Sequence, residues 1–252
     1  MIDFQKCSFE EIKDMVSEYF RGKDILVDSF FEQYALKSNY YKIMLKENNI
    51  GFLSISGEEL ITLFHVDDKY SYISQEVFHK AKKMEQVSEC FVATGDEPLV
   101  SLCMDNYQTI VKQAYFSRYP IMEYGKNHIE LIEASIEDKE LIEEKSGDFF
   151  DDVEVCLKNH KLYIVKSDNK LVGFGIIEMG IIRDDLGSIG MFVLESERRK
   201  GYGKSILQEL SRITISRGKK PISGCWYYNH NSLKTQFSAG AYCHSRLLRF
   251  KF

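Results

Sequence analysis

The sequence predicts an α/β protein made of two tandem copies of one unit, each a mixed, mostly antiparallel sheet flanked by helices. In both halves a capped helix precedes a hairpin, and a strand and a helix follow. Residues 50–52 and 172–174 each place a glycine between apolar residues, and Gly51 and Gly173 lie 122 residues apart, nearly half of the 252-residue chain. A repeat of this length indicates duplication of a whole unit.

The first half begins with Ser8 and Glu11, a capping-box pattern before an apolar stripe, which predicts a helix ending near Gly22. A hairpin is expected about Asn48 and Asn49. Periodicity predicts the remaining elements of this half as helices over 27–36, 74–84 and 98–107 and strands over 40–45, 51–55, 60–65, 90–93 and 109–116.

The second half repeats this order. Ser135 with Asp138 is another capping box before a helix, and strands over 161–167 and 171–177 form another hairpin about Asp168 and Asn169. Pro120 and residues 125–127 interrupt the chain between the halves. The expected domains are therefore 1–120 and 128–252.

Residues 188–217 carry the most informative pattern. A short apolar run over 189–194 predicts a buried strand, and the apolar spacing from Tyr202 to Ile213 predicts a helix. The turn between them reads Arg-Arg-Lys-Gly-Tyr-Gly-Lys over 198–204, in which glycines allow a ligand to approach the backbone closely. Free amides at a helix start, with cations beside them, predict an anion site suited to a diphosphate.

A second pattern follows downstream. Residues 222–228 read as a strand, and Asn229 opens a helix that ends near Gly240. Arg198, Gly201 and Gly203, followed by Asn229, Ser232 and Gly240, resemble the two linked signatures of the GNAT superfamily of N-acetyltransferases. The resemblance covers about residues 128–252. It implies the same α/β fold and acetyl-CoA as cosubstrate. We expect no metal, because the cysteines are scattered without a C-x-x-C pair.

The resemblance also assigns the coenzyme contacts. Backbone groups near Met191 and Val193 would pair with the pantetheine arm as if it were another strand. Asn229 and Ser232 would contact that arm or a phosphate, besides capping their helix. The diphosphate would bind the turn, where the contributing residues are Arg198, Arg199, Lys200, Gly201, Tyr202, Gly203 and Lys204, with the Arg198 and Lys204 side chains assisting.

The first half lacks such a turn. At the matching place it carries residues 67–72, Asp-Asp-Lys-Tyr-Ser-Tyr, with two acids and no glycine. Like charges at this position repel a diphosphate. We therefore expect the first domain to be a degenerate copy that shapes an acceptor site or an oligomer contact, and the second domain to be catalytic.

The implied chemistry is direct attack of a primary amine on the thioester, through a tetrahedral oxyanion that a backbone N–H could stabilise. The tyrosine acid of many relatives aligns with Gln236, which has no acid function. Tyr228 or Tyr242 would then protonate the thiolate, or it leaves unassisted. Candidate bases are Glu178, Glu195, His230 at its helix start, and a water chain.

Two other hypotheses stay open. The second domain could hold acyl-CoA as a non-catalytic sensor or scaffold, which the missing tyrosine would allow. A nucleotide-binding protein using the same turn for ATP ranks last, because the turn has neither the P-loop order nor G-x-G-x-x-G. The acceptor is open among polyamines, antibiotics, amino acids and protein lysines, and acidic loops favour a cationic one.

Composition and charge limit the partners and the cellular location that we expect. A net charge of -5 argues against a nucleic-acid partner. The charged start is unlike a signal peptide, and no apolar run approaches the roughly 18 residues of a membrane helix, so we expect a cytoplasmic protein with no membrane partner. The 6 cysteines lie mostly in apolar runs without a C-x-x-C pair, which favours reduced core thiols.

Overall fold

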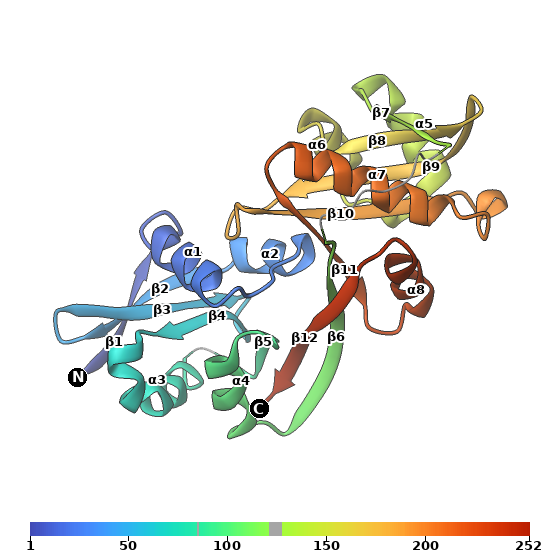
Figure 1. Ribbon diagram of the computed structural model, residues 1–252. Helices are drawn as coiled ribbons and strands as arrows, with labels where there is room; N and C mark the ends of the chain where they lie inside the picture. Colours follow the sequence, from blue (N-terminus) through green and yellow to red (C-terminus); the bar gives the residue numbers. More distant parts are fainter. Residues whose placement is uncertain (85, 121–127) are drawn as a thin grey trace. The chain divides into compact units, whose positions relative to one another are not determined.

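The computed structural model describes residues 1–84, 86–120 and 128–252 (Figure 1). They form two compact units. The first comprises Met1–Phe116, Ile181–Arg183 and His244–Phe252, and the second comprises Ser117–Gly180 and Asp184–Cys243. Residues 125–127, which the sequence suggests as part of the domain boundary, lie outside the described residues. The boundaries 1–120 and 128–252 stay a prediction.

The first unit is a sheet in the order β1-β2-β3-β4-β5-β12-β6, in which the pairs from β1 to β12 are antiparallel except for the parallel pair β4–β5. Its strands are β1 (Ile2–Cys7), β2 (Asn39–Leu45), β3 (Asn48–Ser56), β4 (Leu60–Val66), β5 (Glu89–Ala93), β6 (Thr109–Arg118) and β12 (Tyr242–Lys251), of which β6 and β12 continue into the second unit. Its helices are α1 (Lys13–Gly22), α2 (Ser29–Leu36), the 3₁₀ helix η1 (Asp68–Ile73), α3 (Ser74–Ala81) and α4 (Glu97–Met104).

Helices cover both faces of this sheet. Phe52 of β3 makes an edge contact with the ring of Tyr19 in α1, whereas the next residue, Leu53, packs in the cluster that holds Phe78 of α3 and Leu102 of α4. Neighbouring residues of a strand point to opposite faces, so each face has its own apolar layer.

The second unit orders its strands β11-β10-β9-β8-β7, antiparallel except for the parallel pair β10–β11. The strands are β7 (Glu130–Glu133), β8 (Leu162–Ser167), β9 (Lys170–Met179), β10 (Leu186–Val193) and β11 (Lys220–Trp226). The helices are η2 (Ile136–Asp138), α5 (Lys139–Ser146), η3 (Gly147–Phe149), α6 (Val153–Lys158), η4 (Glu195–Glu197), α7 (Tyr202–Ser216) and α8 (His230–Ser238).

Alternation along β9 and β10 again produces two layers. Ile177 and Ile189 pack with Leu207 and Leu210 of α7. Phe174 packs in a separate cluster with residues of α5 and α6, including Ile142 and Leu157. The predicted fold, two tandem mixed sheets with flanking helices, is confirmed.

The two units repeat one backbone pattern. The amide of Asp67, just after β4, donates to Ile50 O at 2.8 Å, and the amide of Leu194, just after β10, donates to Val172 O at 3.1 Å. A Cβ on Gly51 would lie 2.0 Å from His65 O, and one on Gly173 would lie 2.1 Å from Phe192 O. Both glycines are therefore required because a neighbouring carbonyl occupies the space of a side chain.

Several elements differ from the sequence expectation. The helix expected from Ser8 begins at Lys13, because Glu11 bonds the Ser8 amide while residues 9–12 form turns. Besides the short 3₁₀ helices, the sequence analysis did not predict three strands and one α-helix, which are β1, β7, β12 and α6. Strand β12 pairs with β5, from Leu247 opposite Ala93 to Lys251 opposite Glu89, and so completes the first unit with residues from the end of the chain.

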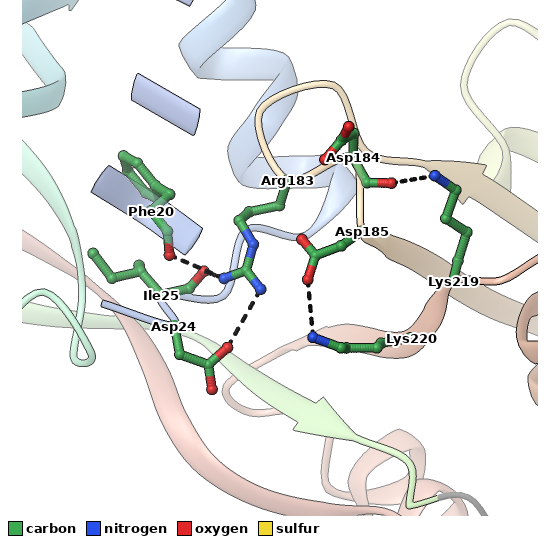
Figure 2. A network of polar contacts seen from close by, with 8 residues as sticks. All are labelled: Phe20, Asp24, Ile25, Arg183, Asp184, Asp185, Lys219 and Lys220. Atoms are coloured by element: carbon green, nitrogen blue, oxygen red, sulfur yellow. Dashed lines mark hydrogen bonds and ion pairs between the residues drawn. The ribbon is translucent and has the colours of Figure 1, made fainter. Parts of the chain in front are cut away.

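Residues 181–183, between β9 and β10, also belong to the first unit. The guanidinium of Arg183 is 1% exposed and donates from Nη1 to Phe20 O at 3.0 Å and Ile25 O at 2.7 Å (Figure 2). Nη2 lies 3.3 Å from Asp24 Oδ1. Glu32 accepts the amides of Ile181 and Ile182, so a short segment is held at both ends by buried charge-assisted hydrogen bonds.

Candidate functional site

The turn between β10 and α7 leads into the helix through two residues with positive φ. Arg199 has φ 64° and Gly201 has φ 91°, and the second value suits glycine because no Cβ obstructs it. Gly201 is the N-cap of α7, and no side chain in the described part of the chain caps this helix. The first turn of α7 also carries no acidic residue. Its N–H groups, at the positive end of the helix, are therefore available to an anion.

The cations of the turn fall into two groups. Glu197 is buried and accepts Lys170 and Lys200, hydrogen bonds that lower the pKa of its carboxyl to about 2. Lys200 is thus paired with an anion of its own domain. Arg198 is exposed, and its Nε donates to Val193 O at 3.3 Å.

Arg199 and Lys204 are also exposed, and neither side chain makes an ion pair or hydrogen bond with the described residues. They are the cations of the turn best placed to meet an external anion. The sequence interpretation paired Lys204 with Arg198 as the assisting side chains. The geometry adds Arg199, because Arg198 already bonds the end of β10.

The strand before the turn presents an unpaired edge. β10 and β11 pair in parallel from Leu186 opposite Lys220 to Ser188 opposite Ile222. Beyond these residues the two strands do not pair with each other in the described part of the chain, although β10 stays paired with β9 as far as Val193. Leu186 O and the Leu194 amide bond toward β9, so alternation turns the backbone groups of Ile189, Met191 and Val193 toward β11. An extended ligand can therefore add to this edge as a strand does.

Helix α8 borders the same gap. Asn229 is its N-cap and accepts the Ser232 amide at 3.1 Å, which confirms the expected capping. A Cβ on Gly203 would lie 2.9 Å from Thr235 Cγ2 of α8 and 3.4 Å from Met191 Sδ. The structure thus brings the turn, β10 and α8 together. It also shows that glycine at 203 serves helix packing, a reason that the sequence did not reveal.

The catalytic candidates are more scattered. Tyr228 and Tyr242 are 54% and 42% exposed, and the Tyr228 ring packs at 5.1 Å against that of Trp226. Glu195 and His230 are exposed, in η4 and at the start of α8. Glu178 pairs with Ser188 across β9 and β10 and accepts Lys161 Nζ at 3.1 Å.

Gln236 is a core residue. It is 2% exposed, and its Oε1 accepts the Ser117 hydroxyl at 2.7 Å. Two residues after Ser117, the Tyr119 hydroxyl lies 3.0 Å from Ser223 Oγ. Sequence reasoning missed this pair because it ended the strand at Phe116. The run Ser-Arg-Tyr over 117–119, which extends the alternation of that strand, was the available signal.

Comparisons with known proteins bear on both units. The family model described as "Acetyltransferase (GNAT) domain" matches residues 8–120, and that described as "Acetyltransferase (GNAT) family" matches residues 126–235. Together they span most of the chain. The chain belongs to the GNAT superfamily. A search of curated proteins gave no significant match.

Solved structures agree on the fold. A GNAT acetyltransferase from Colwellia psychrerythraea has a TM-score of 0.87 at 18% identity, covering 100% of this chain and 99% of that one. A GCN5-related N-acetyltransferase from Sphaerobacter thermophilus has a TM-score of 0.64 at 10% sequence identity, and the match covers 99% of this chain and 95% of that one. A tandem GNAT protein from the clavulanic acid biosynthesis pathway has a TM-score of 0.60 at 8% identity, and the match covers 100% of this chain and 98% of that one. At these identities the likeness establishes the tandem GNAT fold.

GNAT proteins are acetyltransferases that use acetyl-CoA as cosubstrate, and the second domain fits this coenzyme. The uncapped start of α7 suits a diphosphate, and the unpaired edge of β10 suits the amide-bearing pantetheine arm. Among the described residues, no cluster of His, Cys, Asp or Glu side chains is placed to hold a metal ion, and no helix is long and apolar enough to cross a membrane.

The first GNAT domain also has two parallel strands, β4 and β5, that pair over a short stretch, but different side chains lie beyond it. β4 and β5 pair only at Leu60–Glu89 and Ile61–Cys90. Beyond that point Tyr19 stacks on His65 at 3.9 Å, and its hydroxyl donates to Asp96 at 2.6 Å. Burial lowers the pKa of His65 to about 4 and raises that of Asp96 to about 6. The Tyr19 side chain thus connects β4 with the N-cap of α4, which follows β5, beside a cavity of about 190 Å³.

Proposed function

We propose that this chain is an acetyl-CoA-dependent N-acetyltransferase whose second domain binds the coenzyme and acetylates a primary amine. The observation that carries the proposal is the uncapped start of α7 below Arg199 and Lys204, next to the unpaired edge of β10. A diphosphate and an amide-bearing arm are the parts of acetyl-CoA that this combination recognises.

Each residue has a role in binding or orientation. The amides from Arg199 to Lys204 hold the diphosphate, and the side chains of Arg199 and Lys204 add charge-assisted hydrogen bonds. The backbone groups of Met191 and Val193 orient the arm and offer an N–H to the developing oxyanion. When bound, acetyl-CoA supplies the thioester that the amine attacks.

The acceptor is a small-molecule or peptide amine. Glu178, Glu195, His230 and a water chain stay candidates for taking its proton, and Glu178 is the one that lies on a strand next to β10, opposite Ser188. Lys161 Nζ lies 3.1 Å from its Oε1 and so fixes the position of this carboxylate beside β10.

We further propose that the first domain does not bind the coenzyme. Asp67 and Asp68 stand where the second domain has its cationic turn, and Tyr19 packs on His65 of β4, the strand that corresponds to β10, with its hydroxyl on Asp96. Calorimetry on the full chain should therefore give one acetyl-CoA per chain. A second site of comparable affinity would contradict the assignment of a degenerate copy.

A charge-reversal experiment tests the coenzyme site. The double variant Arg199→Glu, Lys204→Glu should raise the Kd for acetyl-CoA at least about tenfold, because a hydrogen bond to a charged group contributes about 1.5–3 kcal/mol. The control Lys37→Glu, Lys46→Glu changes the net charge equally at exposed residues of the first domain. Equal affinity in both double variants would refute the phosphate turn.

Product formation separates an enzyme from a sensor. The buried position of Gln236 leaves the sensor hypothesis open, because that side chain offers no acid to a leaving thiol. The full chain should release free CoA from acetyl-CoA when it is incubated with suitable amines from a panel. Mass spectrometry then identifies the acetylated amine. Tight coenzyme binding without any acetylated product would favour the sensor.

A further inference from the structure

A buried pair of hydroxyls lies at the root of the gap between β10 and β11. Ile222 is the last residue of β11 that pairs with β10, and Ser223 follows it. Ser223 Oγ lies 3.0 Å from Tyr119 Oη, and the two residues are 2% and 5% exposed. The Tyr119 amide donates to Pro221 O at 3.2 Å, which fixes the tyrosine beside β11.

The surroundings of this pair are apolar. Tyr119 packs in the same cluster as Ile189 of β10 and Ala239 and Ala241 at the end of α8. A buried hydroxyl is costly without a partner, and these two partner each other. Two residues earlier, Ser117 bonds Gln236 of α8. Ser117 and Tyr119, at and just after the end of β6, thus make polar contacts with α8 and β11 within otherwise apolar surroundings.

This position relates directly to the proposed coenzyme path. The arm of the coenzyme would follow the edge of β10 from the turn at α7 back toward Ser188, where the strands pair again and the gap closes. When the diphosphate is bound at the turn, the thioester end of the coenzyme lies at the closed end of the gap. Ser223 and Tyr119 lie at this end, whereas Tyr228 lies beyond the other end of β11 and is more than half exposed.

We propose that Ser223 and Tyr119 protonate the departing thiol, Ser223 as the catalytic residue and Tyr119 as the positioning residue that acts through it. This inference rests on the proposed function. The amine nitrogen bonds to the carbonyl carbon as the carbon–sulfur bond breaks, with its electron pair left on sulfur. Ser223 gives its proton to that sulfur, Tyr119 replaces the proton on Ser223, and water returns to Tyr119 the proton that the amine loses.

The test compares Tyr119→Phe and Ser223→Ala with Tyr163→Phe in the full chain. Tyr163 is a matched control, because it is 4% exposed, belongs to the same apolar cluster and loses one hydrogen bond, from Arg217, when its hydroxyl is removed. Thermal melts and circular dichroism establish that each variant is folded. Ser223→Ala keeps the test decisive if Tyr119→Phe fails to fold.

Two readouts are expected to move together. Turnover with acetyl-CoA falls about tenfold to a hundredfold in Tyr119→Phe and Ser223→Ala, with the Kd for acetyl-CoA unchanged. By calorimetry, the wild-type chain binds CoA more tightly than desulfo-CoA, and both variants lose that preference while Tyr163→Phe keeps it. The second readout reports contact with sulfur without any turnover.

The outcomes separate this inference from the proposed function. Wild-type acetylation with Tyr119→Phe and Ser223→Ala behaving like Tyr163→Phe would overturn the hydroxyl pair alone. A wild-type chain that binds neither acetyl-CoA nor CoA would overturn both. A loss of turnover with the preference for CoA over desulfo-CoA intact would refute contact with the thiol.

Discussion

Replacing Arg183 by methionine should destabilise the first unit by removing donors from two buried carbonyl oxygens. The guanidinium is 1% exposed and bonds Phe20 O and Ile25 O at 3.0 and 2.7 Å (Figure 2). Methionine keeps most of the apolar stem but has no N–H. Because the partners are backbone groups, the substitution cannot remove them. Ile25 O loses the Arg183 donor, whereas Phe20 O keeps the Ile25 amide, which donates to it at 2.9 Å.

The size of the effect follows from these contacts. Ile25 O, left without this donor, costs about 1–3 kcal/mol, and the bond lost at Phe20 O, which keeps another donor, costs about 0.5–1.5 kcal/mol. The variant no longer buries a charged guanidinium, and the desolvation cost that it avoids offsets part of this loss of stability. The third partner contributes little, because the Asp24 side chain is 62% exposed and such ion pairs contribute about 0–1 kcal/mol. We expect the free energy of unfolding of the first unit to fall by about 2 kcal/mol.

Hydrogen exchange with mass spectrometry is the appropriate assay. The chain has 1 tryptophan, Trp226 of the second unit, so tryptophan fluorescence does not report on the first. Exchange should accelerate in peptides from α1 and α2 in Arg183→Met, and urea unfolding followed by circular dichroism should shift. Asp24→Asn is the control and should change stability by less than about 1 kcal/mol. Equal effects of the two variants would refute the reasoning.

Three further predictions concern the core of each unit. Burial raises the pKa of Asp96 to about 6, so its stabilising contribution is present below about pH 4 and is lost as pH rises through about 6. Urea titrations should therefore show that the free energy of unfolding of Asp96→Asn rises by about 3 kcal/mol relative to that of the wild type between pH 4 and pH 7. A difference in stability that is the same at both pH values would contradict the raised pKa. Gly173→Ala should cost about 3 kcal/mol or prevent folding, because its Cβ would lie 2.1 Å from Phe192 O, whereas Gly22→Ala, with nothing within 4 Å of its Cβ, should change the melting temperature little. Gln236→Ala should cost about 1–3 kcal/mol by leaving the Ser117 hydroxyl without its acceptor, while acetyl-CoA affinity stays at the wild-type value; an unchanged melting temperature would exclude the buried hydrogen bond.

The sequence alone was sufficient for features that depend on neighbours along the chain. Apolar alternation and helical spacing predicted β10, α7 and the turn between them, since these patterns reflect the two or three residues on either side. Asn229 capping α8 is equally local, because its partner is the amide three residues later. The 122-residue spacing of Gly51 and Gly173 indicated the repeat, which the matching backbone contacts confirm.

Tertiary structure decided what depends on residues far apart in sequence. The sequence did not show whether Gln236 belongs to a site or to the core. The structure assigns it to the core, because its side chain accepts a hydrogen bond from Ser117, 119 residues away. Tyr119 meets Ser223 across 104 residues, and the last strand of the chain completes the sheet of the first unit. Side-chain periodicity states which face of an element is buried but not which element covers it, because that choice depends on the packing of the whole chain.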